Sequence, residues 1–130
     1  LVVICQNLKN LTIERPAAGQ VPALMEKLIR RINWWQQNSR FQFESYHLKY
    51  LAQLHYQFLR ISPFVYGNGR TARALSYFLM KCESLQPIIF TDYDKFETYF
   101  PSIAQETPYH MIEYFKIKYR FNLALMPFLT

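Results

Sequence analysis

The stretch ISPFVYGNGRTARAL, residues 61–75, holds two of the three glycines in a chain of 130 residues. Gly67 and Gly69 permit backbone angles that are closed to other residues, and they let an anion approach the main chain. A helical pattern follows directly. The unpaired N–H groups of its first turn and the positive end of its dipole therefore both lie next to the glycines. Arg70 and Arg73 lie three residues apart and can lean toward one face of that turn. Because a planar guanidinium suits phosphate oxygens, the stretch predicts a site for a di- or triphosphate.

The same turn has a plainer interpretation as a joint between two helices, with glycines serving geometry and arginines lying in solvent. Asn68 adds a side-chain donor, but a Gly-x-Gly pair is weak evidence by itself. The turn is not a Walker-type loop, because the Lys-Ser/Thr ending is missing. It is not a dinucleotide fingerprint either, because a helix precedes it where a strand should be. The residues alone leave the two interpretations about equal.

Helical spacing of apolar residues extends outward from the turn in both directions. We predict helices over about 21–35, 44–60 and 68–82, a short helix around 96–103, and a last helix through 112–123. The second helix is expected to bury Leu48, Leu51, Ala52, His55, Phe58 and Leu59. The third helix is expected to bury Thr71, Ala74, Leu75, Phe78, Leu79 and Cys82. At the start, Leu1 to Glu14 read as extended, with a small hairpin. The expectation is a mostly α single domain that forms part of a longer chain, because the first residue is not Met.

The composition is that of a chain that can form a hydrophobic core, and its net charge favours anionic partners. Hydrophobic residues make up 51% and aromatic residues 18%, so the chain is not disordered by composition. Cys5 and Cys82 are interpreted as reduced interior thiols, which favours a cytoplasmic location. The net charge of +6 favours phosphate-bearing partners, but its scattered distribution makes nucleic acid the less favoured one. No signal peptide and no membrane-spanning stretch are visible, so no membrane partner is expected.

The segment SPFVYGNGRTAR, residues 62–73, closely resembles the signature of Fic domains, His-x-Phe-x-Asp/Glu-Gly-Asn-Gly-Arg-x-x-Arg. The segment VPALMEKLIRRINWW (21–35) looks like the family's helix after its flap, and YLAQLHYQFLRI (50–61) looks like the helix that leads into the motif. The segment TPYHMIEYF (107–115) is similar to the closing segment. The resemblance implies a Fic-like helical bundle, with 1–14 as a β-hairpin flap and 21–126 as the helical core. Fic proteins mostly transfer AMP from ATP to a hydroxyl of a target protein.

The resemblance also implies roles for individual residues. Phe64 matches the buried phenylalanine that anchors the motif loop, and the flap would pair with a strand of a target or regulatory protein. Asn68 matches the residue at the α-phosphate, and the two arginines match those at the β- and γ-phosphates. Nucleotide and phosphate binding is thus assigned to Gly67, Asn68, Gly69, Arg70 and Arg73, with ATP or another nucleotide as the ligand.

Two positions depart from the pattern. The family's catalytic His, which takes the proton from the attacking hydroxyl, falls on Ser62, and serine has no accessible basic form near neutral pH. Loss of a positioned base typically lowers the rate by about 10²–10⁴-fold. The acidic magnesium ligand falls on Tyr66, and a neutral phenol is a poor ligand for a hard cation, which makes Mg²⁺ doubtful. Transfer chemistry relies on that metal to neutralise developing charge, so ordinary AMP transfer is not expected.

No other group is expected to replace the missing base. His55 lies seven residues before Ser62, or roughly 10 Å along a continuous helix, and it matches a structural position of the family. His47 and His110 are interpreted as ordinary histidines. Ser62 could act as a nucleophile, but no visible partner activates it, and a serine that caps a loop is favoured. Tyr66 either stacks on a base or fills the space of the lost carboxylate, and the family's inhibitory Ser/Thr-x-x-x-Glu-Gly/Asn motif is absent.

Three hypotheses follow from these residues. The favoured one is a nucleotide-binding, catalytically impaired relative of the protein AMP-transferases. The first alternative is an active Fic-type adenylyltransferase with non-standard chemistry. The second is a non-enzymatic interaction or nucleic-acid-binding module. The family's habits are compatible with a bacterial regulatory or toxin-like role.

Overall fold

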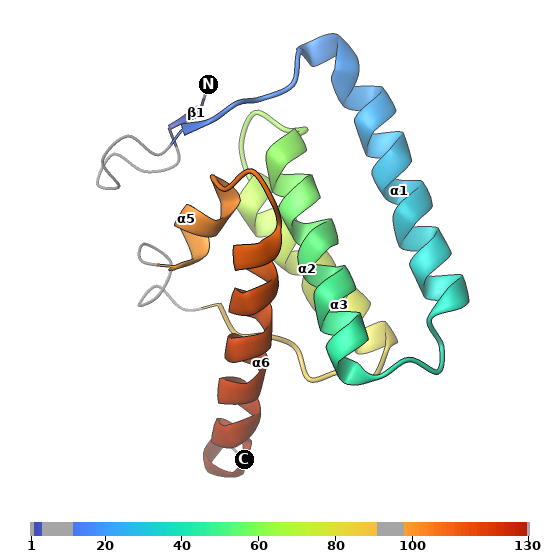
Figure 1. Cartoon of the computed structure of the whole chain (residues 1–130), viewed down its shortest axis with the longest axis vertical. Coiled ribbons are helices and arrows are strands. Elements are labelled where there is room, and N and C mark those ends of the chain that lie inside the picture. Colours follow the sequence, from blue (N-terminus) through green and yellow to red (C-terminus); the bar gives the residue numbers. More distant parts are fainter. Residues whose placement is uncertain (1, 4–11, 91–97, 130) are drawn as a thin grey trace.

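The computed structural model describes residues 2–3, 12–90 and 98–129 (Figure 1). A 3₁₀ turn, η1 (Ala18–Gln20), leads into the first helix. The helices in chain order are α1 (Val21–Asn38), α2 (Glu44–Ile61), α3 (Asn68–Cys82), α5 (Phe100–Ile103) and α6 (Tyr109–Leu129). The predicted mostly α class and the predicted helices are therefore confirmed over the described residues. Among these residues, no helix is long and apolar enough to cross a membrane.

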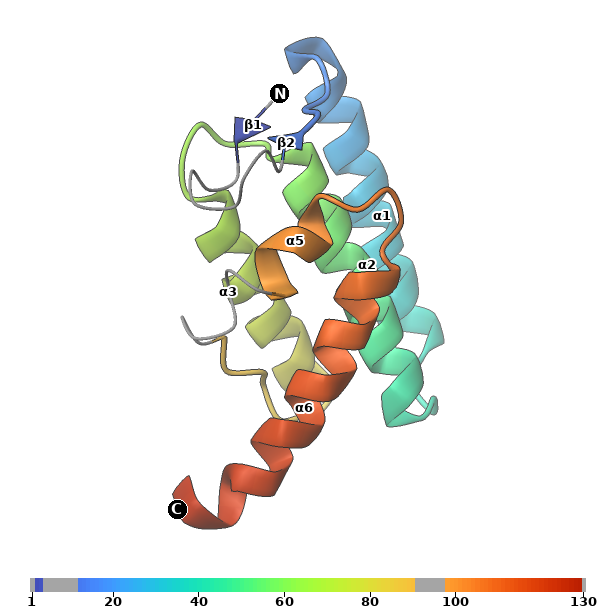
Figure 2. The ribbon, with the colours of Figure 1, turned by 60° about the vertical axis from the view of Figure 1, so that its left-hand side comes forward.

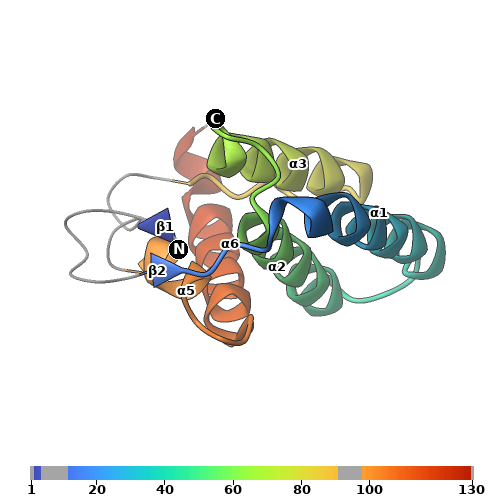
Figure 3. The same ribbon diagram turned by 90° about the horizontal axis from the view of Figure 1, so that it is seen from above.

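Helix α2 is the centre of the bundle. It packs against α1, α3, α5 and α6, and the view from above shows α1, α3 and α6 arranged around it (Figure 3). All six residues of α2 that were predicted to face inward are buried. Since α2 ends at Ile61, directly before the glycine-rich turn, the most buried element of the fold positions the loop of interest.

Helices α1 and α2 form for reasons that are visible in their sequences. Pro22 occupies the first turn of α1, where the missing N–H has no intrahelical partner to lose. At its other end, the Nδ2 of Asn38 donates to the carbonyl of Trp34 at 2.8 Å, so this side chain folds back onto the last turn of the helix. Trp35 is fully buried against α2, with its ring 5.5 Å from that of His47. His47, which was interpreted only as an ordinary histidine, is thus part of the packing between α1 and α2.

The buried face of α3 differs from the predicted one. Its buried residues are Ala72, Ser76, Leu79 and Met80, whereas the side chain of Phe78 is 59% exposed. Cys82 is also exposed, so the prediction of an interior thiol is wrong there, and Cys5 lies outside the described residues. The periodicity was correct, but the face is rotated because Ser76 pairs with a histidine in the core. A polar residue at a core position gives no apolar signal to a sequence pattern.

The expected β-hairpin flap over residues 1–14 is wrong as an element of the fold. Within the described residues, β1 (Val2–Val3) and β2 (Thr12–Ile13) pair over two residues each, with Val2 opposite Ile13 and Val3 opposite Thr12. The expected polar turn, residues 6–10, lies outside the described part of the chain. A ladder this short cannot form an independent sheet, because even a complete isolated hairpin is marginal in water. Helices alone therefore build the fold.

The last two helices close the bundle on the side of α2 away from α1 (Figure 2). The predicted short fourth helix is present as α5, and residues 91–97 at its expected start lie outside the described residues. Tyr99, just before α5, is fully buried among aromatic rings that include those of Phe90 and Tyr114.

Candidate phosphate-binding loop

The loop begins where Ser62 ends helix α2. Ser62 has left-handed backbone angles, φ 47° and ψ 66°, and its N–H donates to the carbonyl of Phe58 at 2.9 Å. Its hydroxyl turns back and donates to the carbonyl of Leu59 at 2.5 Å. A non-glycine residue in this conformation costs about 1–2 kcal/mol, and the capping bonds help to offset that cost. The hydroxyl at this position is thus used to finish a helix.

Asn68 closes the loop from its other end. Its Oδ1 accepts from the N–H of Phe64 at 2.9 Å, and its Nδ2 donates to the carbonyl of the same residue at 2.8 Å. The side chain therefore mimics a strand partner and holds the intervening residues in a closed turn. The predicted phosphate donor is accordingly also a structural brace, with one Nδ2 proton already engaged.

Gly67 starts helix α3 from the left-handed region, with φ 85°. Its carbonyl accepts from both the N–H and the hydroxyl of Thr71, at 2.9 and 2.8 Å. A Cβ added to Gly67 would meet nothing within 4 Å, so only its backbone conformation demands glycine. The turn is thereby held at the N-terminus of α3, where the free N–H groups of the first helical turn lie.

Sequence reasoning missed Arg15, which holds the loop from outside. Its Nη2 donates to the carbonyls of Ser62 and Phe64, at 2.8 and 3.0 Å. Residues 15–20 were interpreted only as a connector, and 47 residues separate Arg15 from Ser62. No local pattern could have indicated this contact, because it depends on how the connector crosses the end of α2.

Phe64 and Tyr66 occupy positions that differ from expectation. The ring of Phe64 lies 6.5 Å from that of Phe58 but is 50% exposed, so the prediction of a buried anchor is wrong. The loop is anchored by its main chain instead, through Asn68 and Arg15. Tyr66 is 90% exposed, and its side chain therefore fills no interior space.

The two arginines of the turn have different surroundings. Arg73 folds over the first turn of α3, so that a Cβ on Gly69 would lie 3.0 Å from its Nη1. Its guanidinium also hydrogen-bonds to the hydroxyl of Tyr99. Arg70, by contrast, is exposed and makes no hydrogen bond or ion pair with any residue that the structure describes. Arg70 is therefore the free cation of the turn, and Arg73 is held toward the core.

A buried polar network lies behind Arg73. The Nδ1 of His55 is 2.8 Å from the hydroxyl of Ser76, and its Nε2 is 2.6 Å from the hydroxyl of Tyr99. Burial, with the nearby charge of Arg73, lowers the pKa of His55 to about 3. Burial also raises the pKa of Tyr99 to about 12, against the opposing effect of Arg73. Both groups are therefore neutral at pH 7.

This network excludes His55 as a substitute base. Its imidazole is buried, both ring nitrogens have partners, and a group with so low a pKa is a weak proton acceptor. The prediction that His55 is structural agrees with these contacts. His110 is exposed on α6, far along the chain from the loop.

The donor set at the loop does not fit a magnesium ion. The family's carboxylate position carries the phenol of Tyr66, and hard cations prefer carboxylate and carbonyl oxygens. Among the described residues, no group of three or more His, Cys, Asp and Glu side chains is placed to hold a metal.

Comparison with known proteins supports the motif-based resemblance. The family model described as the Fic/DOC family matches residues 6–80. Proteins named protein adenylyltransferase Fic from Drosophila mojavensis and Drosophila grimshawi are 33% and 32% identical over 92 residues. These matches cover 70% of this chain but only 17% and 18% of the relatives. The chain thus spans less than a fifth of their length. With the loop geometry and this match over residues 6–80, the chain belongs to the Fic/DOC family.

Proposed function

We propose that this domain binds a nucleotide, with ATP as the first candidate, at the turn formed by residues 67–73, and that it transfers AMP poorly or not at all. The relatives carry the name protein adenylyltransferase, which favours ATP. The single observation that carries the proposal is the contrast between an intact turn and an altered base position. Gly67 opens a helix whose first N–H groups face outward, and Arg70 stands free beside them.

The loss of chemistry rests on Ser62 and its surroundings. The resemblance puts the family's proton acceptor at this position, and here a hydroxyl donates to the Leu59 carbonyl. A serine hydroxyl has no basic form near neutral pH, and without an adjacent base it is a weak nucleophile. The nearest candidate along the chain, His55, is neutral and enclosed.

Tyr66 supports the same conclusion for the metal. An exposed phenol with no carboxylate in its place offers little to a divalent cation. Binding of the nucleotide would therefore depend on helix N–H groups and on arginine, and it would depend little on Mg²⁺.

The test is calorimetric titration of ATP into the 130-residue chain, with and without Mg²⁺. The wild type is expected to bind, and Arg70→Ala is expected to weaken binding by about 10-fold or more, because a charge-assisted contact is lost. Arg40→Ala is the matched control, since Arg40 is also an exposed arginine but lies on the connection between α1 and α2. Absence of binding at millimolar ATP, or an equal loss in both variants, would contradict the proposal.

A second experiment tests the missing chemistry. The double variant Ser62→His with Tyr66→Asp restores the two groups of the family signature and is expected to gain AMP transfer from labelled ATP to protein. The wild type is expected to give none. Label from the wild type, lost in Arg70→Ala, would instead identify an active adenylyltransferase with non-standard chemistry.

A further inference from the structure

A second cavity lies on the other side of the α2 end, between α1 and α2. It has a volume of about 540 Å³, within the range of pockets that hold small molecules. Its floor is apolar and includes Leu24, Leu28 and Ile61. Neither Asn68 nor Arg70 lines it, so it is distinct from the turn at residues 67–73 that is proposed to bind ATP.

The walls of this cavity carry an excess of positive charge. Four cations and one carboxylate line it: Arg15, Lys27, Arg31, Arg60 and Glu14. No ion pair within the described residues neutralises Lys27 or Arg31. Arg60 donates to the carbonyl of Ile103 at 3.2 Å, which leaves its charge uncompensated. Like charges around one hollow repel one another in the absence of an anion, and they raise the local concentration of anions.

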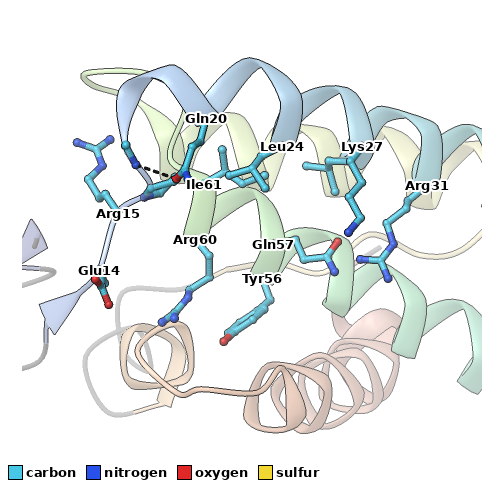
Figure 4. A pocket seen from close by; sticks show the side chains of 13 residues that line it. Glu14, Arg15, Gln20, Leu24, Lys27, Arg31, Tyr56, Gln57, Arg60 and Ile61 are labelled. Atoms are coloured by element: carbon cyan, nitrogen blue, oxygen red, sulfur yellow. Dashed lines mark hydrogen bonds between the residues drawn. The ribbon is translucent and has the colours of Figure 1, made fainter.

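Cationic and amide side chains of α1 and α2 approach one another at one end of the cavity (Figure 4). Figure 4 shows Lys27 and Arg31 extending from α1 toward Gln57 on α2. Arg60 and Tyr56 extend from the same face of α2 toward the connection between α5 and α6. Lys27 and Arg31 lie four residues apart and therefore share one face of α1.

Tyr56 adds an aromatic surface with a fixed position. Its hydroxyl donates to the carbonyl of Gln105, and the guanidinium of Arg60 lies 5.6 Å from the centre of its ring. The ring therefore cannot swing away, and the cation stays beside it. The cavity thus combines an apolar floor, an aromatic ring, the amides of Gln20 and Gln57, and four cations with one carboxylate.

We propose that this α1–α2 cavity is a binding site for a small organic phosphate, meaning a phosphate ester that carries an apolar or aromatic group. The cations would hold the phosphate oxygens, since guanidinium groups and lysine both bind phosphate. Leu24, Leu28 and the ring of Tyr56 would contact the apolar group. A small molecule fits better than a peptide strand, because the lining comes from three segments around one hollow.

The cavity is physically joined to the phosphate-binding loop. Arg15, Pro16 and Ile61 also line a smaller hollow of about 250 Å³ that includes Ser62 and Phe64. Arg15 donates to the carbonyls of both loop residues through Nη2, so one residue that lines the cavity is hydrogen-bonded to the loop. Occupation of the cavity would therefore act on the loop through Arg15.

The test uses phenyl phosphate as the probe, titrated into the ¹⁵N-labelled chain and followed by NMR, with phenol and inorganic phosphate as comparisons. Phenyl phosphate is expected to shift the signals of Lys27, Arg31 and Gln57 first. The double variant Lys27→Gln with Arg31→Gln is expected to weaken this binding by about 10-fold or more. The control Arg30→Gln with Lys49→Gln removes the same charge from exposed positions outside the cavity and should leave it unchanged.

The Arg70→Ala variant separates this site from the loop. Phenyl phosphate binding at the cavity should survive it, even if ATP binding at the loop is lost or was never present. Shifts confined to residues 67–70, an equal effect of the two double variants, or no binding at millimolar probe would each overturn the proposal. Tighter binding of phenol than of phenyl phosphate would overturn it as well, because the charges would then be irrelevant.

Discussion

Several residues of the motif loop have structural roles that their residue types alone do not indicate. Ser62 caps a helix in a left-handed conformation, and Asn68 makes two hydrogen bonds to the backbone of Phe64. These bonds explain how a loop of half-exposed side chains keeps one shape. They also mean that a substitution here changes loop geometry as well as ligand contacts, so binding data need matched stability data.

Gly67 provides a direct test of the loop's backbone. We expect Gly67→Ala to lower the free energy of unfolding by about 1–2 kcal/mol, because φ 85° is unfavourable for any residue with a Cβ. Urea denaturation measures this. Gly19→Ala is the control, since neither glycine has an atom within 4 Å of an added Cβ, and Gly19 lacks the positive φ. Equal effects of the two changes would show that the left-handed turn is not required.

Arg15 provides a test of the contact that sequence reasoning missed. Arg15→Ala is expected to destabilise the loop, because two carbonyls, those of Ser62 and Phe64, lose their donor. Amide exchange of residues 62–68 should become faster, and ATP affinity should fall with it. Arg120→Ala, an exposed arginine on α6, is expected to change neither. An unchanged amide exchange rate of the loop in Arg15→Ala would contradict the role given to the two Arg15 hydrogen bonds.

At the scale of elements, the bundle is joined by one polar network as well as by apolar packing. His55 of α2 binds Ser76 of α3 and Tyr99 before α5, and Tyr99 in turn binds Arg73. The first turn of α3 is thereby linked to the aromatic core. The orientation of α3 follows from this network, because Ser76 must face His55.

The network predicts a pH dependence of stability. Burial lowers the pKa of His55 from 6.5 to about 3, so between these values the unfolded chain binds a proton that the folded chain does not. Stability is therefore expected to fall as the pH decreases below about 6.5, by up to about 1.4 kcal/mol per pH unit, and to stop falling on this account below about pH 3.

The measurement is the urea midpoint of unfolding between pH 7 and pH 4. His55→Gln cannot titrate and should show a shallower slope, whatever its absolute stability. His110→Gln, at an exposed position, should keep the wild-type slope. Identical slopes in the wild type and His55→Gln would mean that His55 binds a proton equally well in the folded and unfolded chains, which contradicts the lowered pKa.

At the scale of the whole molecule, stability depends on the central position of α2. Leu51 on this helix is only 1% exposed. Its replacement by alanine should lower the free energy of unfolding by about 2–5 kcal/mol, because a cavity opens in the core. Against a total stability of about 5–15 kcal/mol, this change leaves the domain close to unfolding. Leu123→Ala on α6, where the side chain is 40% exposed, should have a much smaller effect in the same thermal or urea experiment.

Local signals in the sequence were enough for the helices and for the glycine turn. Apolar residues at helical spacing located α1, α2 and α3. Such signals succeed because a helix satisfies its backbone within itself, and its buried stripe follows from residues three or four apart. The signature at residues 62–73 depends on consecutive residues in the same way, and it led to the family.

The predictions that failed needed information from distant residues. The buried face of α3 was predicted wrongly because Ser76, which hydrogen-bonds to His55, lies in the core. Phe64 was expected to be buried, but its ring is half exposed, and the loop is held by hydrogen bonds from Asn68 and Arg15 to its backbone. The short pairing of residues 2–3 with 12–13 replaced an expected hairpin, since extended pairs need a neighbouring sheet or helix to persist.

By itself, the sequence determined which segments are helical, where the glycine-rich turn starts, and that a serine and a tyrosine stand at two positions of the family motif. Only the tertiary structure decided that Arg15 holds the loop, that Arg73 is turned toward Tyr99 while Arg70 stays free, and that cations gather between α1 and α2. The physical reason is range. Helix formation and glycine turns depend on neighbours along the chain, whereas clamps, buried networks and cavities depend on residues that folding alone brings together.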